Sequence, residues 1–172
     1  MVGLETPFEL KGLKLRNRIV MPPMCQYSVY AEDGTPTDWH YVHYVSRAIG
    51  GTGLIIIEMT NVEPDGRITN RCLGLWSDDH VPAFRRIIRA CQEHGAKVAI
   101  QIAHAGRKAE DAPVPVGPMA EAYSERYRTP RALTTEEVKG LVVKYADAAR
   151  RAVEAGVDAV ELHGAHGYLI HQ

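Results

Sequence analysis

Four short apolar runs, separated by longer amphipathic segments, constrain the fold of this chain more than any other feature. The runs cover residues 18–21, 54–58, 97–101 and 159–163. Three of them are nearly continuous in Val, Ile and Leu, which is typical of parallel strands that are buried on both faces. The alternation of such strands with helical segments predicts a parallel βα series.

The first two intervening segments carry clear helix signals. The first helix is expected to start at Thr37 or Asp38 and to end before Gly50, where a glycine C-cap is available. The second is expected to begin after residues 77–79 and to end at Gly95. Its apolar side chains share one face at helical spacing and are Val81, Phe84, Ile87, Ile88 and Cys91.

A third helix is predicted by a capping box formed by Thr134 and Glu137, and Gly156 is expected to end it. Its predicted buried stripe contains Val138, Leu141, Val142, Tyr145, Ala149, Ala152 and Val153. Before the first strand, residues 8–15 alternate around Gly12 and predict a hairpin that would plug the amino-terminal mouth of a barrel. The long, proline-containing segment between residues 103 and 132 is typical of a lid or capping element.

The order of elements distinguishes two parallel α/β architectures. A dinucleotide-binding sheet would need a G-x-G-x-x-G turn after the first strand, but residues 21–27 contain no glycine. A barrel is therefore favoured, and a complete barrel has eight strands in roughly 250 residues. With four strands, the fold class is predicted to be α/β: the N-terminal half, four βα units plus a hairpin, of a TIM (β/α)8 barrel. Residues 1–172 would then form the N-terminal half of a single domain, with the second half absent from this chain.

Composition and charge exclude several classes of partner. The net charge is -1 with both signs interspersed, so we expect no nucleic-acid partner. The longest apolar run, residues 54–57, is too short for a bilayer, and the N-terminus lacks signal-peptide features, so we expect no membrane partner. The three cysteines show no CxxC spacing, which predicts free thiols and a cytoplasmic location. We interpret Cys72 and Cys91 as inert buried thiols.

Polar and soft side chains gather where each predicted strand ends. Because a barrel builds its active site from the carboxyl ends of its strands, these residues form the candidate site. They are Met24, Cys25, Tyr27, Glu58, Met59, Thr60, Gln101, His104, His163, His166 and Tyr168.

His163 and His166 allow three interpretations. A metal site is disfavoured because no third ligand and no H-E-x-x-H motif accompany the pair. The two histidines could instead be structural and cap a turn. Alternatively, both could donate hydrogen bonds to one substrate oxygen and stabilise developing negative charge, with Tyr168 as a proton donor.

Five motifs, in order, carry a resemblance to a known family. They are NRIVMPPMCQY at 17–27, SRAIG at 46–50, GRIT at 66–69, QIAHAGRK at 101–108 and HGAHGYLIH at 163–171. The chain resembles the Old Yellow Enzyme family of flavin-dependent ene-reductases, specifically its "thermophilic-like" bacterial subclass, from about residue 6 to residue 172.

The resemblance implies an FMN cofactor that is reduced by NADPH or NADH. The flavin then passes hydride to the C=C bond of an α,β-unsaturated carbonyl compound. His163 and His166 match the pair that holds the substrate's carbonyl oxygen, with Gly164 and Ala165 in the same substrate-binding turn. Tyr168 matches the residue that donates a proton to the substrate.

The resemblance also assigns cofactor contacts. Tyr27 matches a substrate-contacting tyrosine, and Gln101 matches an amide that hydrogen-bonds the flavin. Met59 falls beside the flavin, where the subclass more often has a small residue. The backbone segment that would lie against the flavin contains Pro22, Pro23, Met24 and Cys25. The family's phosphate-binding loops belong to the second half of the barrel.

The remaining residues at the rim are expected to have structural roles. Glu58 is expected to make a structural hydrogen bond rather than to act as a general base. His104, Arg107 and Lys108 are interpreted as loop-anchoring residues.

Three functional hypotheses remain open from the sequence. In the first, this half-barrel is an ene-reductase together with a complementary C-terminal half-barrel chain, in a homo-oligomer of the assembled barrel. In the second, it is a non-catalytic or self-associating half-barrel fragment. In the third, it is a related flavin barrel with another substrate, such as a dienoyl thioester; the pair Cys25 and Tyr27 favours the ene-reductase.

Overall fold

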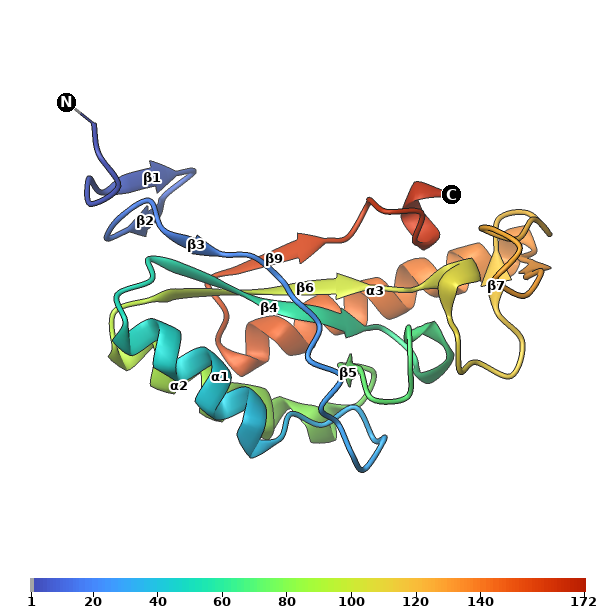
Figure 1. Cartoon of the computed structure of the whole chain (residues 1–172), viewed down its shortest axis with the longest axis horizontal. Coiled ribbons are helices and arrows are strands. Elements are labelled where there is room, and N and C mark those ends of the chain that lie inside the picture. The colour runs from blue at the N-terminus through green and yellow to red at the C-terminus, as the bar shows by residue number, and fades with distance from the viewer. Residues whose placement is uncertain (1) are drawn as a thin grey trace.

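A parallel sheet forms the centre of the molecule. The computed structural model describes residues 2–172. Strands β3 (Val20–Met21), β4 (Leu54–Asn61), β6 (Lys97–Ala103) and β9 (Ala159–Leu162) pair in parallel, in the same order as in the chain. The short strand β5 (Leu73–Gly74) also pairs with β4 in parallel. The carboxyl ends of the four main strands therefore point toward one end of the molecule (Figure 1).

Three helices cover one face of this sheet. They are α1 (Asp38–Ile49), α2 (Val81–Glu93) and α3 (Thr135–Ala155). All three contribute to one apolar core with β4 and β6, and α2 lies between α1 and α3 (Figure 1). A doubly wound sheet would carry helices on both faces. Sequential parallel strands with all helices on one face are the arrangement of half a TIM barrel, as predicted.

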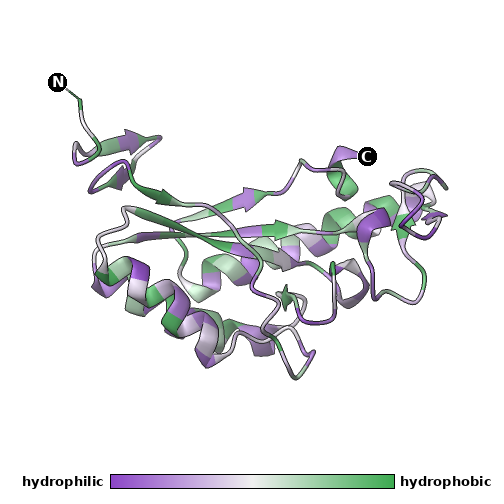
Figure 2. Ribbon diagram, viewed as in Figure 1, coloured by the Kyte–Doolittle hydropathy of each residue, from purple (hydrophilic) through white to green (hydrophobic). Residues whose placement is uncertain are grey.

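The core is built from the apolar side chains that the helical and strand patterns predict. On α2, all five predicted residues are buried. On β4 and β6 nearly every residue is buried, because these central strands are covered by the helix layer and by the loops at their carboxyl ends. Figure 2 shows the apolar colouring of these strands and of the helix surfaces that face them.

The predicted stripe of α3 is partly wrong. Val138, Val142 and Val153 are exposed by 44%, 64% and 66%. The residues of α3 that are buried are Leu141, Ala148, Ala152 and Ala155. The helix is the last of the layer, so α2 and β6 cover only one flank, and the valines lie on the uncovered flank.

The helix ends and the hairpin agree with their predicted positions. Thr37 precedes α1, and Gly156, with φ +100°, follows α3 in the left-handed conformation that favours glycine. Thr134 Oγ1 accepts from Glu137 N at 3.2 Å, and Thr134 N donates to Glu137 Oε2 at 2.8 Å, which completes the capping box. Strands β1 (Phe8–Leu10) and β2 (Leu13–Leu15) pair antiparallel at the amino ends of the sheet strands (Figure 1).

The long segment after β6 contains strand pairing that the sequence did not predict. Two short strands, β7 (Val116–Gly117) and β8 (Arg131–Ala132), pair in parallel and tie its ends together. Within residues 2–172, four short 3₁₀ helices complete the elements: η1 (Pro64–Gly66), η2 (Asp78–His80), η3 (Gly106–Lys108) and η4 (Leu169–His171).

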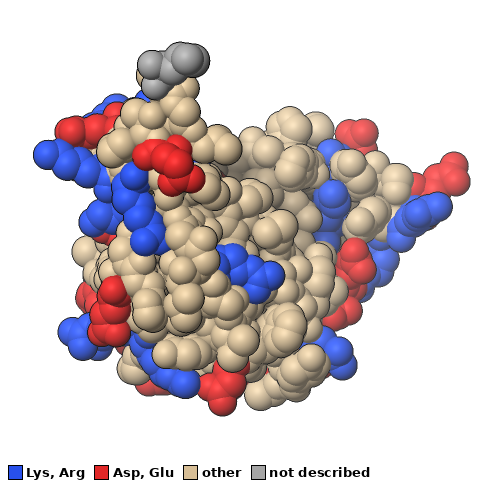
Figure 3. All heavy atoms as spheres, turned by 60° about the vertical axis from the view of Figure 1, so that its left-hand side comes forward, with Lys and Arg blue, Asp and Glu red and all other residues tan. Residues whose placement is uncertain are grey.

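The surface is charged and mixed in sign. On the face drawn in Figure 3, basic and acidic side chains lie next to one another around a broad uncharged area. Among residues 2–172, no helix combines the length and the apolar character that a membrane crossing requires.

The carboxylate of Asp158 joins three elements at the amino end of β9. It accepts hydrogen bonds from Val98 N at 2.9 Å, Gln92 Nε2 at 3.0 Å and Lys97 Nζ at 2.7 Å. Burial of Asp158 acts to raise its pKa, but the hydrogen bonds from Lys97, Gln92 and Val98 outweigh it, and the pKa lies below its usual value. Asp158 therefore fixes the start of β9 against α2 and β6.

We expect Asp158→Ala to lower the free energy of unfolding at pH 7 by about 1–3 kcal/mol, because the Val98 N–H loses its acceptor. A carboxylate with a lowered pKa in the folded state stabilises above its unfolded pKa, and this stabilisation is lost as pH falls through the folded pKa. Urea denaturation should therefore show the difference from wild type shrinking below about pH 4. The exposed Asp65→Ala is the control, with a change within about 0.5 kcal/mol. An equal loss in both variants would contradict this role.

Candidate active site

A buried carboxylate holds the segment that follows β3. Glu58, on β4, is fully buried. Its Oε2 accepts from Gln26 N at 2.7 Å, and its Oε1 accepts from Tyr44 OH at 3.1 Å. The same Tyr44 oxygen accepts from Glu58 N at 2.9 Å. The predicted structural hydrogen bond of Glu58 is confirmed, and it positions the backbone between Cys25 and Tyr27.

His40, on α1, faces the same carboxylate as a neutral ring. Its Nδ1 accepts from Thr37 N at 3.0 Å, so the proton of the neutral imidazole lies on Nε2, which is 3.5 Å from Glu58 Oε1. Burial lowers the pKa of His40 to about 4. Burial also raises the pKa of Glu58 to about 7, although the hydrogen bonds from Gln26 and Tyr44 act in the opposite direction. The two groups therefore do not form a salt bridge at neutral pH.

The predicted histidines and tyrosine of the last loop meet at the carboxyl end of β9. His163 N donates to Ile102 O at 3.1 Å, so the sheet ladder continues to His163 itself. The ring centroid of His163 lies 5.4 Å from that of His166 and 4.9 Å from that of Tyr168. His163 is buried, His166 is exposed and Tyr168 is half-buried. The sequence-predicted trio thus forms one cluster of two imidazoles and a phenol.

The protonation of this cluster suits hydrogen-bond donation to a neutral or anionic oxygen. Burial is the largest cause that lowers the pKa of His163, and the neighbouring His166 and Lys108 lower it further. The ring is therefore neutral at pH 7. Burial raises the pKa of Tyr168 to about 12, so its hydroxyl keeps its proton. The cluster can therefore offer imidazole N–H groups and one phenolic proton at one place.

Two residues of the candidate site have a strained backbone. Tyr27 has φ +50° and His166 has φ +57°, in the left-handed region that non-glycine residues seldom adopt. The backbone at Tyr27 is held by the hydrogen bond that Gln26 N donates to Glu58 Oε2. The backbone at His166 is held because Lys108 Nζ donates to His166 O at 3.1 Å. Strain of this kind persists where the surroundings fix it, and it is common at functional sites.

Lys108 joins the long segment to the cluster. Its ammonium lies over three tyrosine rings, 4.2 Å from the centroid of Tyr123, 6.0 Å from that of Tyr127 and 4.7 Å from that of Tyr168. The sequence predicted a loop-anchoring role for Lys108 but no contact with Tyr123 or Tyr127. The aromatic residues of the segment were the available signal, but nothing in their spacing indicated which cation they would face.

Soft and apolar side chains form the floor of the candidate site, beside the cluster of His163, His166 and Tyr168. Met59 is 2% exposed and belongs to a second apolar cluster that Cys25 and Tyr168 contact. Cys72 lies in this cluster too, beside Cys25. The sequence had indicated Cys25 as a site residue and Cys72 as an inert one, and the structure brings them together.

Gln101 and the remaining predicted residues are distributed around this floor. Gln101, 8% exposed, donates from Nε2 to Glu161 Oε1 on the adjacent strand at 2.7 Å. The turn between His163 and His166 places Ala165 O where Tyr168 N donates to it at 3.2 Å, and Gly164 is exposed. The proline segment is at the surface: Pro22 and Met24 are exposed and Pro23 is half-buried.

His104 is a loop anchor, as predicted. Its Nδ1 accepts from Gly106 N at 2.9 Å, and its Nε2 lies 2.6 Å from Glu63 Oε1. Lys144 of α3 also binds Glu63. This chain of polar contacts fixes the end of β6 against α3.

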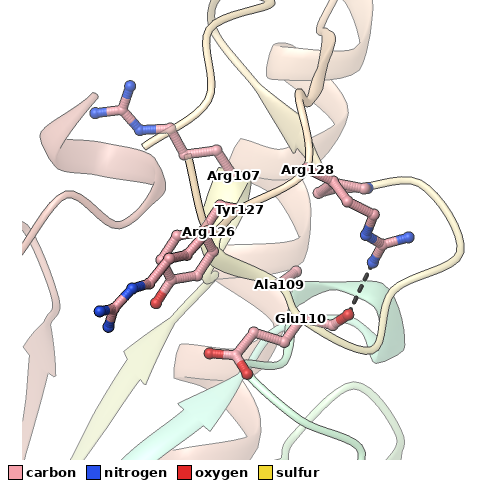
Figure 4. Close-up of a pocket in the computed structure, with 7 residues that line it drawn as sticks. Arg107, Ala109, Glu110, Arg126, Tyr127 and Arg128 are labelled. Carbon is pink, nitrogen blue, oxygen red and sulfur yellow. Dashed lines mark hydrogen bonds between the residues drawn. The ribbon is translucent and has the colours of Figure 1, made fainter. Parts of the chain in front are cut away.

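A cavity of about 330 Å³ lies within the long segment beside this rim. Its lining residues are Arg107, Ala109, Glu110, Pro115, Arg126, Tyr127 and Arg128. The three guanidinium groups point in different directions (Figure 4). Arg128 donates to the backbone oxygens of Glu110 at 2.8 Å, Ala112 at 2.6 Å and Pro113 at 3.1 Å. The arginine therefore organises the segment, and the three cations do not converge on one anion.

Residues 4–172 match the sequence pattern of a family described as the NADH:flavin oxidoreductase / NADH oxidase family. The chain belongs to this family. It is 52% identical to an NADPH dehydrogenase of Listeria welshimeri over 172 residues, which are 100% of this chain and 51% of the relative. It is 50% identical to an NADPH dehydrogenase of Bacillus subtilis over 169 residues, 98% of this chain and 50% of the relative.

Solved structures agree with this membership. Morphinone reductase superposes with a TM-score of 0.87 at 33% identity, over 97% of this chain and 49% of that one. The Old Yellow Enzyme homologue from Zymomonas mobilis superposes with a TM-score of 0.85 at 32% identity, over 96% and 49%. The resemblance to Old Yellow Enzymes and the half-barrel fold are confirmed. The chain spans about half the length of the curated relatives it matches.

The hydrogen bonds of Glu58 give a pH-dependent prediction. A carboxyl whose pKa is about 7 when folded and 4.5 when unfolded loses its proton first in the unfolded chain, so its contribution to stability falls between pH 4.5 and 7. Relative to Glu58→Gln, the wild type should lose on the order of 1–3 kcal/mol of unfolding free energy across this window.

Urea denaturation of both proteins at several pH values measures this difference in unfolding free energy. Because both proteins contain the same buried histidines, the difference reports the titration of Glu58 alone. The exposed Glu93→Gln is the matched control and should follow the wild type at every pH. A constant difference between wild type and Glu58→Gln from pH 4.5 to 7 would show that Glu58 titrates normally.

Proposed function

We propose that the protein containing this chain is an FMN-dependent ene-reductase. It would transfer hydride from NADPH or NADH, through the flavin, to the C=C bond of an α,β-unsaturated carbonyl compound. The observation that carries the proposal is the cluster of His163, His166 and Tyr168 at the carboxyl end of β9. Membership of a flavin oxidoreductase family and the NADPH dehydrogenase names of its relatives support it.

The residues around the cluster fit a flavin. A flavin ring needs an apolar or polarisable surface against its face and hydrogen-bonding groups along its edge. Buried Met59 and half-buried Cys25 offer the first. Gln101 offers the second, because its amide nitrogen binds Glu161 and its Oε1 has no hydrogen-bond partner within residues 2–172. When bound, FMN supplies the hydride chemistry.

The side chains of this chain would bind and protonate the substrate. His163 and His166 would each donate an N–H to the carbonyl oxygen, which draws electron density from the C=C bond and stabilises the negative charge that develops there. Tyr168 would donate its phenolic proton to the α-carbon. Tyr27, Gly164 and Ala165 would contact the substrate around this oxygen site. Pro22, Pro23 and Met24 would form the backbone wall beside the flavin.

The rest of the barrel would come from a complementary C-terminal half. Residues 1–172 would then be the N-terminal half of a single FMN-binding domain, and the second half would supply the flavin phosphate site. An apolar groove between α3 and the end of the chain, with a volume of about 310 Å³, supports such a neighbour; it is lined by residues that include Val142, Leu162 and Ile170. The assembled barrel would form a homo-oligomer.

A second candidate function rests on the same groove. A non-catalytic half-barrel could cover this apolar surface by binding another copy of itself. Absorbance and mass spectrometry separate the two functions: the ene-reductase requires a yellow sample with both halves of the barrel, whereas self-association gives a colourless dimer of this chain. The pair Cys25 and Tyr27 supports an enone substrate over a dienoyl thioester.

Tyr168→Phe tests the proton donor in the complete barrel loaded with FMN. We expect the oxidation of the reduced enzyme by 2-cyclohexenone to slow by about 10²- to 10⁴-fold, because a general acid is lost. Reduction by NADPH should be unchanged, since that step needs no proton from Tyr168. Stopped-flow absorbance measures the two steps separately.

Tyr30→Phe is the matched control, because this exposed ring lies outside the cluster, and both steps should proceed at the wild-type rate. If Tyr168→Phe oxidises at the wild-type rate, another group donates the proton. If both steps slow equally, Tyr168 acts on cofactor binding instead.

A further inference from the structure

Cys25 and Cys72 form a pair of thiols that take no part in the proposed hydride and proton transfers. Cys25 lies in the segment after β3, and Cys72 immediately precedes β5. Cys72 belongs to the apolar cluster that contains Met59, Cys25 packs against that cluster, and each thiol lies close enough to the other to shift its pKa. The third cysteine, Cys91, is buried in the main core under α2, in a separate cluster.

The backbone independently holds the two cysteine segments together. Val29 N donates to Arg71 O at 3.1 Å, which joins the segment that follows Cys25 to the residue just before Cys72. Cys72 N donates to Thr69 O at 3.0 Å and closes the turn that carries Cys72. A disulfide needs two Cβ atoms that lie close together, and this backbone hydrogen bond holds the two cysteine-bearing segments side by side.

The surroundings favour a thiolate at Cys72. Its Sγ lies 3.5 Å from Thr69 N, which donates to it, and 3.9 Å from Thr69 Oγ1. The hydrogen bond from Cys25 and these donors lower the pKa of Cys72 to about 7, whereas the hydrogen bond with Cys72 and burial raise the pKa of Cys25. Cys72 is fully buried and Cys25 is half-exposed, so a small oxidant reaches the pair over Cys25.

We propose that Cys25 and Cys72 are a redox-active dithiol site, whose product is a disulfide formed with a peroxide. The Cys72 thiolate attacks one peroxide oxygen, the O–O bond breaks, and a hydroxide ion leaves. This step gives a sulfenic acid on Cys72. Cys25 then attacks the Cys72 sulfur, the S–S bond forms, and the sulfenic oxygen leaves as water with the Cys25 proton; the hydroxide takes up the proton that Cys72 released on forming its thiolate. Overall, two thiols and one hydrogen peroxide give one disulfide and two waters.

The bridge would change the candidate site. It would covalently tie the segment that carries Tyr27 to the turn that carries Cys72, and it would remove the Cys25 thiol from the floor beside Met59. A dithiol site of this kind does not depend on the proposed ene-reductase activity.

The test uses this chain as it stands, reduced and then treated with one equivalent of hydrogen peroxide. After unfolding and alkylation with iodoacetamide, intact mass spectrometry counts the free thiols. We expect one alkylated cysteine, Cys91, in place of three, and a Cys25–Cys72 linked peptide that is two hydrogens lighter. Dithiothreitol should restore three alkylated cysteines.

Matched variants identify the pair. Cys91→Ser should form the same bridge, whereas Cys25→Ser and Cys72→Ser should form none, with circular dichroism confirming that each is folded. Oxidation in 8 M urea should give a mixture of pairings, because the native contact is absent. Three alkylated cysteines after peroxide, or a sulfinic acid on either member of the pair with the other thiol still free, would overturn the proposal.

Discussion

The carboxylate of Glu58 is the constraint on which the candidate site depends. A carboxyl group without solvent contact is costly to bury unless donors satisfy it. Glu58 receives a backbone N–H from Gln26 and a hydroxyl from Tyr44, and the protonated nitrogen of His40 faces it. The requirement to satisfy this one group joins α1, β4 and the segment after β3.

The two loops that meet at the candidate site are fixed by different means. The segment with Cys25 and Tyr27 is held from within the protein by Glu58. The loop with His166 is held from the surface by Lys108, whose charge also rests on three tyrosines. The strained backbone at Tyr27 and the strained backbone at His166 are therefore each held by a separate hydrogen bond. This arrangement favours a site whose shape is set before a ligand binds.

Local pattern was sufficient to predict most of the fold. Apolar periodicity placed β4, β6, α1 and α2, and turn chemistry placed the hairpin and the ends of α3. The exposed flank of α3 was missed because periodicity shows that a face is apolar without showing what covers it. The pairing of β7 with β8 was missed because two-residue strands leave no periodic signal.

The candidate site was predicted unevenly for a related reason. Residues at strand ends, such as His163 and Gln101, follow from the rule that parallel strands deliver side chains to one rim. The contact of Cys72 with Cys25, and of Lys108 with Tyr123, joins loops far apart in the sequence. Loop conformation decides such contacts, and it depends on backbone hydrogen bonds that no residue pattern specifies.

The sequential order of β3, β4, β6 and β9 has a consequence for how the molecule assembles. Each strand pairs with the strand that precedes it along the chain, and each helix packs beside the previous one. No strand of this path has to wait for a segment further along the chain before it can pair with its predecessor. The sheet can therefore grow one βα unit at a time as the ribosome releases the chain, each completed unit serving as a template for the next.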